Sequence, residues 1–476
     1  MATFYVENFG CRATQADGAA IERQFRDRGL ERASDPAEAG IVVLNTCTVT
    51  AAADQDARAA VRRIRRRNPE AQIVVTGCYA QRAPEEVASL PGVSSVIGNS
   101  HKHQLAEIAL INVGASVPAR ATLEDDRGAA TDFVPLSSLD PASQRRTTGD
   151  QRLIFVSDIF AHTELQAAPV FDASNERTRP NLKVQDGCDN RCSFCVIPYV
   201  RGQSRSLRLD EIIREVESLV NAGYREVVIS GINLGRWGRD LGAGGGSIRP
   251  QRFEDLVGAI LSETALQKLR ISSVEPMDWS DELIQLMAAS SRIAKHAHVP
   301  LQSGSDAVLR RMHRKYRPWH YREKIEKISE AMTAAAIGAD VMTGFPGETE
   351  VEFEATRRLI EELPFTYLHV FTYSARPGTP AATMATQVPV QVARERNRIL
   401  RDLAAKKRRA FMHTFVGKPV EVITLAAPGS NDEGGCTEGL TDNYLPIWLQ
   451  GNHAPNRWIS AKVETVSDGA LVGIAG

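Results

Sequence analysis

The sequence of 476 residues contains no apolar run of membrane-spanning length, and its start, MATFYVENFGC, lacks the basic and apolar regions of a secretory signal. We therefore expect a cytoplasmic protein that does not enter a membrane. An excess of charge of one sign is also missing, because 57 Lys and Arg stand against 58 Asp and Glu. Bulk charge thus does not indicate a nucleic-acid binder, although arginine-rich runs at residues 62–67 and 310–317 are able to meet a phosphate backbone.

Cysteine is scarce, since the chain has only seven. So few thiols in a long chain argue against a disulfide scaffold, and in a reducing compartment they stay available to metals. Three of them, Cys188, Cys192 and Cys195, stand in CxxxCxxC spacing after a strand-like run at residues 182–184. Three thiolates can hold three irons of a 4Fe–4S cluster, which leaves the fourth iron open to a substrate or cofactor.

Other interpretations of this loop are half of a zinc site or a redox pair. A structural zinc ion usually has four protein ligands, and no further Cys or His follows nearby. CxxxCxxC with an aromatic residue, Phe194, directly before the last cysteine resembles the signature of radical S-adenosylmethionine (SAM) enzymes. The resemblance implies that the open iron binds SAM, that the bound SAM is cleaved to a radical, and that Phe194 lies near the adenine.

Residues 3–112 alternate short apolar runs with helical periods, which predicts a parallel, doubly wound α/β sheet. Cys11, Cys47 and Cys78 each follow a predicted strand of this region. Because the carboxyl ends of parallel strands meet at one edge of the sheet, we expect these thiols to converge. Each alone could be an ordinary buried cysteine. The same position after three strands favours a second cluster with three ligands.

From residue 182 the alternation resumes with six further βα units, which predicts an incomplete (β/α)6 barrel with its chemistry at the carboxyl ends of the strands. Polar or glycine-rich runs follow these strands, among them SGINLG, SSVEP and HVPLQSGSD. Each run alone could be a turn or a helix cap, and Glu275 could be structural. Together they resemble the lining of a SAM pocket. We expect SAM or substrate contacts from Ser230, Gly231, Glu275, Gln302 and Ser303.

The last part of the chain has short apolar strands separated by turn residues, which predicts a small all-β barrel. GKPVEV and GLTDNY resemble the TRAM domain, a small RNA-binding barrel. Tyr444, Trp448 and Trp458 could then stack on bases, and Lys418 and Arg457 could meet phosphates. Core burial is the alternative for each aromatic residue, and for Trp448 it is at least as good an interpretation.

The motifs GCRATQAD, NTCTVT and VTGCYAQ resemble the three N-terminal cysteine motifs of the methylthiotransferase family, and HVPLQSGSD, TGFPGET and YSARPGTPAA resemble runs of its radical SAM barrel. Thr14 departs from the Asn that the family often has there, which puts in doubt only the packing near Cys11. The resemblance implies a flavodoxin-like N-terminal domain, two 4Fe–4S clusters and SAM. It also implies an electron donor such as flavodoxin or ferredoxin, the anticodon stem-loop of tRNA as partner, and a monomer.

We therefore predict a methylthiotransferase domain at residues 1–113, a linker at 114–178, the radical SAM barrel at 179–411 and a TRAM-like domain at 412–476. The linker is poor in periodicity apart from one short strand at residues 153–156, and no role is assigned to it. Cys436 has no cysteine nearby in the sequence and is predicted to be a free thiol.

The loops around Cys47 and Cys78 most resemble the branch of the family that converts threonylcarbamoyladenosine in tRNA, next to the anticodon, to its 2-methylthio derivative. A branch acting on isopentenyladenosine in tRNA and one acting on an aspartate of a ribosomal protein are alternatives. A different class is a non-catalytic iron–sulfur protein that binds RNA. Six cysteines in two sets argue against that class, because a carrier has no need of a SAM barrel. Replacing the hydrogen of an unactivated aromatic carbon also requires radical chemistry, since that hydrogen has no useful acidity.

Overall fold

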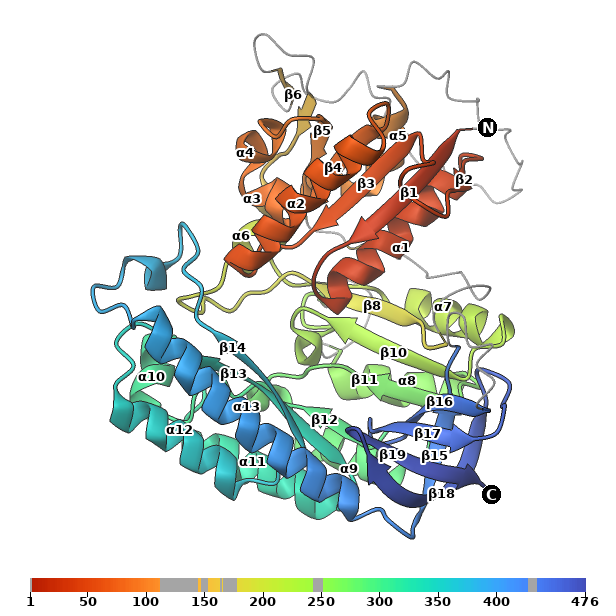
Figure 1. Ribbon diagram of the computed structural model, residues 1–476, viewed down its shortest axis with the longest axis vertical. Coiled ribbons are helices and arrows are strands. Elements are labelled where there is room, and N and C mark those ends of the chain that lie inside the picture. Colours follow the sequence, from red (N-terminus) through yellow and green to blue (C-terminus); the bar gives the residue numbers. More distant parts are fainter. Residues whose placement is uncertain are drawn as a thin grey trace. The chain divides into compact units, whose positions relative to one another are not determined.

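The computed structural model describes residues 2–111, 144–146, 153–162, 165, 178–242, 251–426 and 435–476 (Figure 1). The chain divides into two compact units. The first consists of Met1–Ala168 with Val196–Gln203, and the second of Pro169–Cys195 with Ser204–Gly476. Most of the predicted linker lies outside the described residues. Within the described part of the chain, no helix is both long and apolar enough to cross a membrane.

The first unit is built on a sheet whose described strands have the order β2-β1-β3-β4-β5-β7-β6. The strands are β1 (Thr3–Asn8), β2 (Glu31–Arg32), β3 (Ile41–Thr46), β4 (Gln72–Gly77), β5 (Val93–Ile97), β6 (Gln144–Arg146) and β7 (Leu153–Phe155). Every pairing is parallel except that of β6 with β7. The predicted parallel sheet is confirmed, and the strand predicted at residues 153–156 is β7, which extends this sheet.

Helices lie along this sheet because each has one apolar face to bury. They are α1 (Arg12–Arg26), α2 (Ala51–Arg67), α3 (Cys78–Arg82), α4 (Pro84–Ala88), α5 (Leu105–Ile111) and α6 (Ile197–Arg201), with the 3-10 turns η1 (Asn99–Gln104) and η4 (Ile159–Ala161). Helix α2 shows the pattern: the Thr50 hydroxyl caps its start by accepting from the amide of Ala53. Its buried positions Ala57, Val61 and Ile64 recur every three or four residues.

The second unit begins with two parallel sheets, ordered β11-β10-β8-β9 and β12-β13-β14, in which only β9 is antiparallel to its neighbour. Their strands are β8 (Asn181–Asp186), β9 (Arg205–Ser206), β10 (Glu226–Gly231), β11 (Lys268–Ile271), β12 (His296–His298), β13 (Ala336–Thr343) and β14 (Tyr367–Thr372). Isolated parallel bridges, Leu269 with Ile293 and Ser273 with His298, join the two sheets. The six parallel strands therefore form the incomplete barrel that the sequence predicts.

Helices alternate with these strands, as Figure 1 shows. They are α7 (Leu209–Asn221), α8 (Phe253–Glu263), α9 (Asp281–Ala289), α10 (Asp306–Arg311), α11 (Pro318–Ala331), α12 (Glu350–Glu362) and α13 (Val390–His413), with the 3-10 turns η5 (Leu234–Arg236), η6 (Pro276–Asp278) and η7 (Pro380–Thr383). Helix α12 starts with a full capping box, in which the side chains of Thr349 and Glu352 each accept from the other residue's amide.

The chain ends in a closed barrel of the order β15-β16-β17-β19-β18. Its strands are β15 (Pro419–Thr424), β16 (Cys436–Thr441), β17 (Pro446–Gln450), β18 (Trp458–Ser467) and β19 (Ala470–Ala475). Alternate residues point inward, so Val422, Ile447 and Leu449 are buried completely in its core. The predicted small all-β barrel is confirmed.

Candidate active site

The three cysteines of the first unit lie at the carboxyl ends of three neighbouring strands. Cys11 follows β1 and precedes α1, Cys47 comes directly after β3, and Cys78 directly after β4. Burial and then the charges of the neighbouring Cys78 and Cys11 thiolates raise the pKa of Cys47 to about 12. The structure thus brings the three thiols together, as predicted. A bound metal would offset this raised pKa, since coordination deprotonates a thiol outright.

Two glycines allow the backbone to lie close to the loop that carries Cys47. Gly10 has φ +98°, and a Cβ on it would lie 2.5 Å from the Cβ of Cys47 and 2.9 Å from its Sγ. Gly77 has φ +95°, and a Cβ there would lie 2.3 Å from the carbonyl oxygen of Thr46. Both positions need a left-handed backbone and no side chain. The Gly-Cys pairs of the first and third motifs therefore have a steric cause.

Buried polar groups hold the loops around these thiols. The Asn45 amide donates to the carbonyl oxygen of Thr14 over 2.7 Å and to Asn8 Oδ1 over 2.9 Å. Thr14 is itself buried completely, and its hydroxyl lies 3.6 Å from Cys11 Sγ. In the second motif, Thr48 donates to Asp54 over 2.6 Å. Thr14, where the family often has Asn, is thus accommodated by a contact with the first cysteine.

The segment after the second cysteine set belongs to the first unit. Helix α6 starts two residues after Cys195, and its last residue, Arg201, pairs with buried Asp17 over 2.9 Å. Lys102 also pairs with Asp17 over 2.9 Å. Asn99 donates to the carbonyl oxygen of Val200 over 2.7 Å and approaches Cys78 Sγ at 3.5 Å. Residues next to the first cysteine set therefore anchor α6.

Cys188, Cys192 and Cys195 lie between β8 and α6, and all three are partly exposed cysteines outside any disulfide. Burial raises the pKa of Cys188 to about 11, although the hydrogen bond from the backbone amide of Asn190 acts to lower it. Arg314 Nη1 donates to Cys192 Sγ over 3.3 Å, so a fixed positive charge lies beside this thiol. The loop after the first barrel strand is therefore where the sequence predicts it.

The predicted SAM contacts Ser230 and Gly231 end β10, close to this loop. A Cβ on Gly231 would lie 2.8 Å from Gln185 Oε1, which accepts from the amide of Asn233 over 2.7 Å. The Asn233 side chain in turn reaches Cys188 Sγ at 3.8 Å. The run that begins at Ser230 therefore reaches Cys188 through Asn233. Asn233 was not singled out from the sequence, although it stands in the SGINLG run.

Glu275, Gln302 and Ser303 have different surroundings. Glu275 forms an ion pair with Arg314, which itself contacts Cys192, so Glu275 acts on the loop through that arginine. Gln302 has the left-handed φ of 62°. Ser303 is buried, with its hydroxyl 3.1 Å from that of Thr356. Arg314 is a residue that the sequence analysis missed, because it stands in a basic run that resembles an ordinary charged helix face.

Phe194 packs edge-on against Phe345, with ring centroids 6.4 Å apart. A pocket opens beside Cys192. It is lined by Asn190, Cys192, Arg236, Glu275, Met277, Asp278, His313, Arg314, Lys315 and Tyr316. Within the described residues, buried Ser230 Oγ and Gln302 Oε1 have no hydrogen-bond partner. Three cysteines outside any disulfide and two unsatisfied buried polar atoms fit a cluster with a polar cofactor, because buried polar groups are normally paired.

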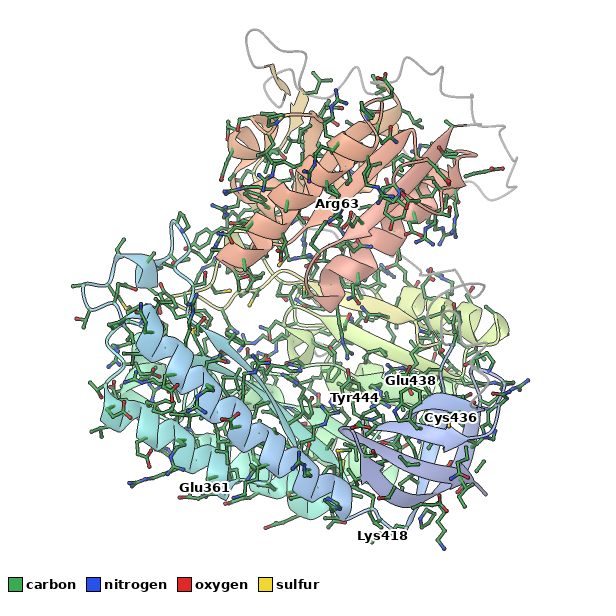
Figure 2. The ribbon with its side chains drawn as sticks, viewed as in Figure 1. Arg63, Glu361, Lys418, Cys436, Glu438 and Tyr444 are labelled. Carbon is green, nitrogen blue, oxygen red and sulfur yellow. The ribbon has the colours of Figure 1, made fainter. Side chains whose placement is uncertain are left out.

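The four predicted RNA contacts fall into two kinds. Lys418 and Arg457 are exposed, whereas both aromatic rings have cationic neighbours within the protein. The Tyr444 ring lies 5.4 Å from the Arg270 guanidinium, and the Trp458 ring 4.9 Å from Lys268 Nζ. Figure 2 shows Lys418 at the outer end of the closed barrel, away from Tyr444.

Two further residues of the closed barrel can be placed. The core interpretation of Trp448 is wrong, since its side chain is 44% exposed. Cys436 is an exposed free thiol, as predicted.

Comparisons with known proteins show which protein family the chain resembles. The Radical SAM superfamily matches residues 182–360, and residues 3–98 match a family described as Uncharacterized protein family UPF0004. The threonylcarbamoyladenosine tRNA methylthiotransferase MtaB of Bacillus subtilis is 34% identical over 95% of this chain and 91% of its own length. The tRNA-2-methylthio-N(6)-dimethylallyladenosine synthase of Novosphingobium aromaticivorans is 32% identical over 88% of this chain and 86% of its own length.

Among solved structures, the radical SAM methyltransferase TsrM of Kitasatospora setae covers 90% of this chain and 79% of its own, with a TM-score of 0.52 and 18% identity, which shows a common fold. An incomplete parallel barrel with three cysteines after its first strand defines a radical SAM enzyme. The chain belongs to the radical SAM methylthiotransferase family, and within it to the proteins that resemble MtaB. It is therefore a SAM-dependent transferase of sulfur-containing groups, and the predicted family is confirmed.

Proposed function

We propose that this enzyme converts threonylcarbamoyladenosine in tRNA, next to the anticodon, to its 2-methylthio derivative. The observation that carries the proposal is the 34% identity to the Bacillus subtilis MtaB across 95% of the chain. The convergence of Cys11, Cys47 and Cys78 supports it, since a second set of three thiols can hold the second cluster that the resemblance to methylthiotransferases implies. The enzyme is proposed to act as a monomer in the cytoplasm, with flavodoxin or ferredoxin as electron donor.

Two 4Fe–4S clusters are proposed, one on Cys11, Cys47 and Cys78 and one on Cys188, Cys192 and Cys195. When bound, the clusters and SAM supply a carbon-centred radical and a methylated sulfur. Arg314 holds a positive charge against Cys192, and Asn233 offers a donor to Cys188, so both steady this loop electrostatically. Iron analysis of anaerobically prepared enzyme is expected to give about eight irons per chain, falling to about four in a Cys11→Ala/Cys47→Ala/Cys78→Ala variant.

SAM is proposed to lie along the strand ends of the barrel, with Phe194, Ser230, Gly231, Glu275, Gln302 and Ser303 as contacts. The hydroxyl of Ser230 and the amide oxygen of Gln302 are buried polar atoms that a polar cofactor would satisfy. Glu275 and Ser303 already bond within the protein, so they position neighbouring groups. Equilibrium binding of SAM to a Ser230→Ala variant tests the first of these contacts.

The closed barrel is proposed to be a TRAM-like domain that binds the anticodon stem-loop. Exposed Lys418 and Arg457 are available to phosphates, and the rings of Tyr444 and Trp458 remain predicted stacking surfaces. The proposed domain limits are residues 1–113, 114–178, 179–411 and 412–476. Charge on the barrel would make tRNA binding weaken as salt rises.

The substrate is tested by expressing the chain in a Bacillus subtilis strain that lacks its own MtaB, followed by mass spectrometry of tRNA nucleosides. Return of the methylthio group on threonylcarbamoyladenosine supports the proposal, and a Cys192→Ala chain is the matched control. The second candidate is dimethylallyladenosine, favoured by the 32% identity to its synthase over 88% of the chain. The chain would be assigned to this second substrate if it restored the methylthio group on dimethylallyladenosine in a strain that lacks the dimethylallyladenosine synthase, but restored none in the strain that lacks MtaB.

A further inference from the structure

Strands β12, β13 and β14 carry a row of polar side chains on one face. Their register pairs His298 with Gly338, Gly338 with Tyr367, and Asp340 with His369. Paired residues of adjacent strands point to the same face of a sheet. The alternate positions Ala297, Ala339 and Val341 are buried completely on the other face. The sheet thus has an apolar side and a side bearing imidazoles, a phenol and a carboxylate.

Three of these side chains converge on one point. His298 Nε2 lies 3.2 Å from Asp340 Oδ2, and His369 Nδ1 lies 3.3 Å from Asp340 Oδ1. Their three ligand atoms all lie within 4.8 Å of one another, and among the described residues they form the one such group of three or more His, Cys, Asp or Glu. His298 is 9% exposed and His369 is 61% exposed, so an ion can enter past His369.

A second layer of contacts orients His298. Its Nδ1 lies 2.9 Å from the hydroxyl of Tyr367, which also lies 2.6 Å from His296 Nε2. The Tyr367 ring crosses β13 at Gly338, where a Cβ would lie 1.9 Å from its Cζ. A histidine that binds a metal through one ring nitrogen almost always uses the other in such a hydrogen bond. The Tyr367 contact therefore leaves His298 Nε2 to face Asp340.

The chemistry of the cluster suits a cation, because it offers two imidazole nitrogens and the oxygens of one carboxylate. That donor set, with open positions left for water, is the one proteins use for divalent first-row transition metals.

We propose that His298, Asp340 and His369, a group that includes no cysteine, bind a divalent transition-metal ion. The backbone of the same segment links this site to the predicted cofactor contacts, because the carbonyl oxygen of Asp340 accepts from the amides of Leu301 and Gln302. An ion on Asp340 would thereby stiffen the segment after β12 that carries Gln302. The proposal does not depend on which adenosine the enzyme modifies.

The experiment is equilibrium dialysis of the reconstituted, cluster-containing enzyme against Zn²⁺, with zinc, iron and sulfide measured per chain. A His369→Ala variant is expected to bind one zinc fewer than the wild type, with unchanged iron and sulfide. His369 is mostly exposed, so this variant should fold normally. Exposed His320 on α11 provides the matched control, and a His320→Ala variant is expected to keep the full zinc content.

Two further variants sharpen the result. Asp340→Asn is expected to lose the same zinc, and Tyr367→Phe to bind it about 10–100-fold more weakly, since it removes the partner of His298. Zinc should also raise the melting temperature of the wild type and of His320→Ala, but not that of His369→Ala. Equal zinc content in the wild type and His369→Ala would overturn the proposal and leave the three residues as a hydrogen-bonded chain.

Discussion

Arg201 Nη2 lies 2.9 Å from Asp17 Oδ2, although the two residues are 184 positions apart in the chain. Arg201 is 2% exposed and Asp17 is 4% exposed, so the pair is buried. Lys102 contacts the same carboxylate over 2.9 Å. One carboxylate thus pairs with two cations, and it ties the segment that follows Cys195 to the helix that follows Cys11.

This arrangement predicts unequal effects of removing either partner. Asp17→Ala takes the carboxylate from buried Arg201 and partly exposed Lys102, and it is expected to destabilise the first unit by about 3–5 kcal/mol. Arg201→Ala should cost less, because Lys102 still neutralises Asp17. Denaturant unfolding measures both. Asp35, whose side chain is exposed and pairs with Arg67, is the control, and Asp35→Ala should unfold close to the wild type. Equal losses in the two buried variants would show that Lys102 does not compensate.

Gly10 gives a prediction about the first cysteine set. Gly10→Ala should displace the Cys47 loop, because the added Cβ would lie 2.5 Å from the Cβ of Cys47. Iron per chain is expected to fall toward about four of about eight, with the radical SAM loop intact. Gly29 is the matched control, since it has φ +78° and open space around its Cβ position. Gly29→Ala bears the same backbone strain and should keep its iron. Loss of iron in both variants would point to strain and not to the contact with Cys47.

Much of the first unit follows from local sequence. The run IVVLNT before Cys47 is buried at every position of β3, as expected for a central parallel strand. Convergence of the three cysteines then follows from the topology of a parallel sheet.

The exposed position of Trp448 in the closed barrel could also have been predicted from the sequence. In β17 the inward positions are Ile447 and Leu449, so alternation places Trp448 outside. Its aromatic character was given more weight than its position.

Contacts between distant segments could not be predicted in the same way. Strand β7 joins the first sheet from within the predicted linker, and α6 joins the first unit from within the predicted barrel. Local patterns carry no information on such partners. The ring of Tyr444 lies beside Arg270, whose carboxylate partner is Glu226, and no spacing rule connects these three residues. The His298 site depends likewise on the register of three strands.

Arg314 gives a prediction about the radical SAM loop. Arg314→Met removes the cation that donates to Cys192 Sγ and pairs with Glu275. Because outer contacts of this kind typically change metal-site activity about 10–100-fold, the yield of 5′-deoxyadenosine from SAM should fall by that order. Mass spectrometry of the products measures it. Arg310, which is 62% exposed and pairs with Asp306, is the control, and Arg310→Met should retain full SAM cleavage. Unchanged cleavage in Arg314→Met would show that the arginine has no influence on this loop.

His101 predicts a loss of stability in acid. Burial and then the nearby His162 and His103 lower its pKa from 6.5 to about 4. The unfolded chain therefore takes up a proton at His101 that the folded chain does not, and stability present above pH 6.5 is lost as the pH falls toward 4. The loss from this group is about 3 kcal/mol. Melting curves of His101→Gln should show a smaller acid dependence, whereas exposed His413→Gln should follow the wild type. An unchanged acid profile in His101→Gln would assign the loss to other groups.

Trp448 leads to a prediction about tRNA binding. Trp448 is 44% exposed on β17, and Glu438 and Val472 lie opposite it on the adjacent strands. An exposed indole on a small barrel is a stacking surface for an unpaired base, worth about 1–3 kcal/mol. Trp448→Ala is therefore expected to weaken binding of the anticodon stem-loop by about 5–150-fold, with an unchanged melting temperature. Trp319, 56% exposed on α11, is the matched control, and Trp319→Ala should bind as the wild type does. Equal affinities of both variants would mean that RNA does not use this face of the barrel.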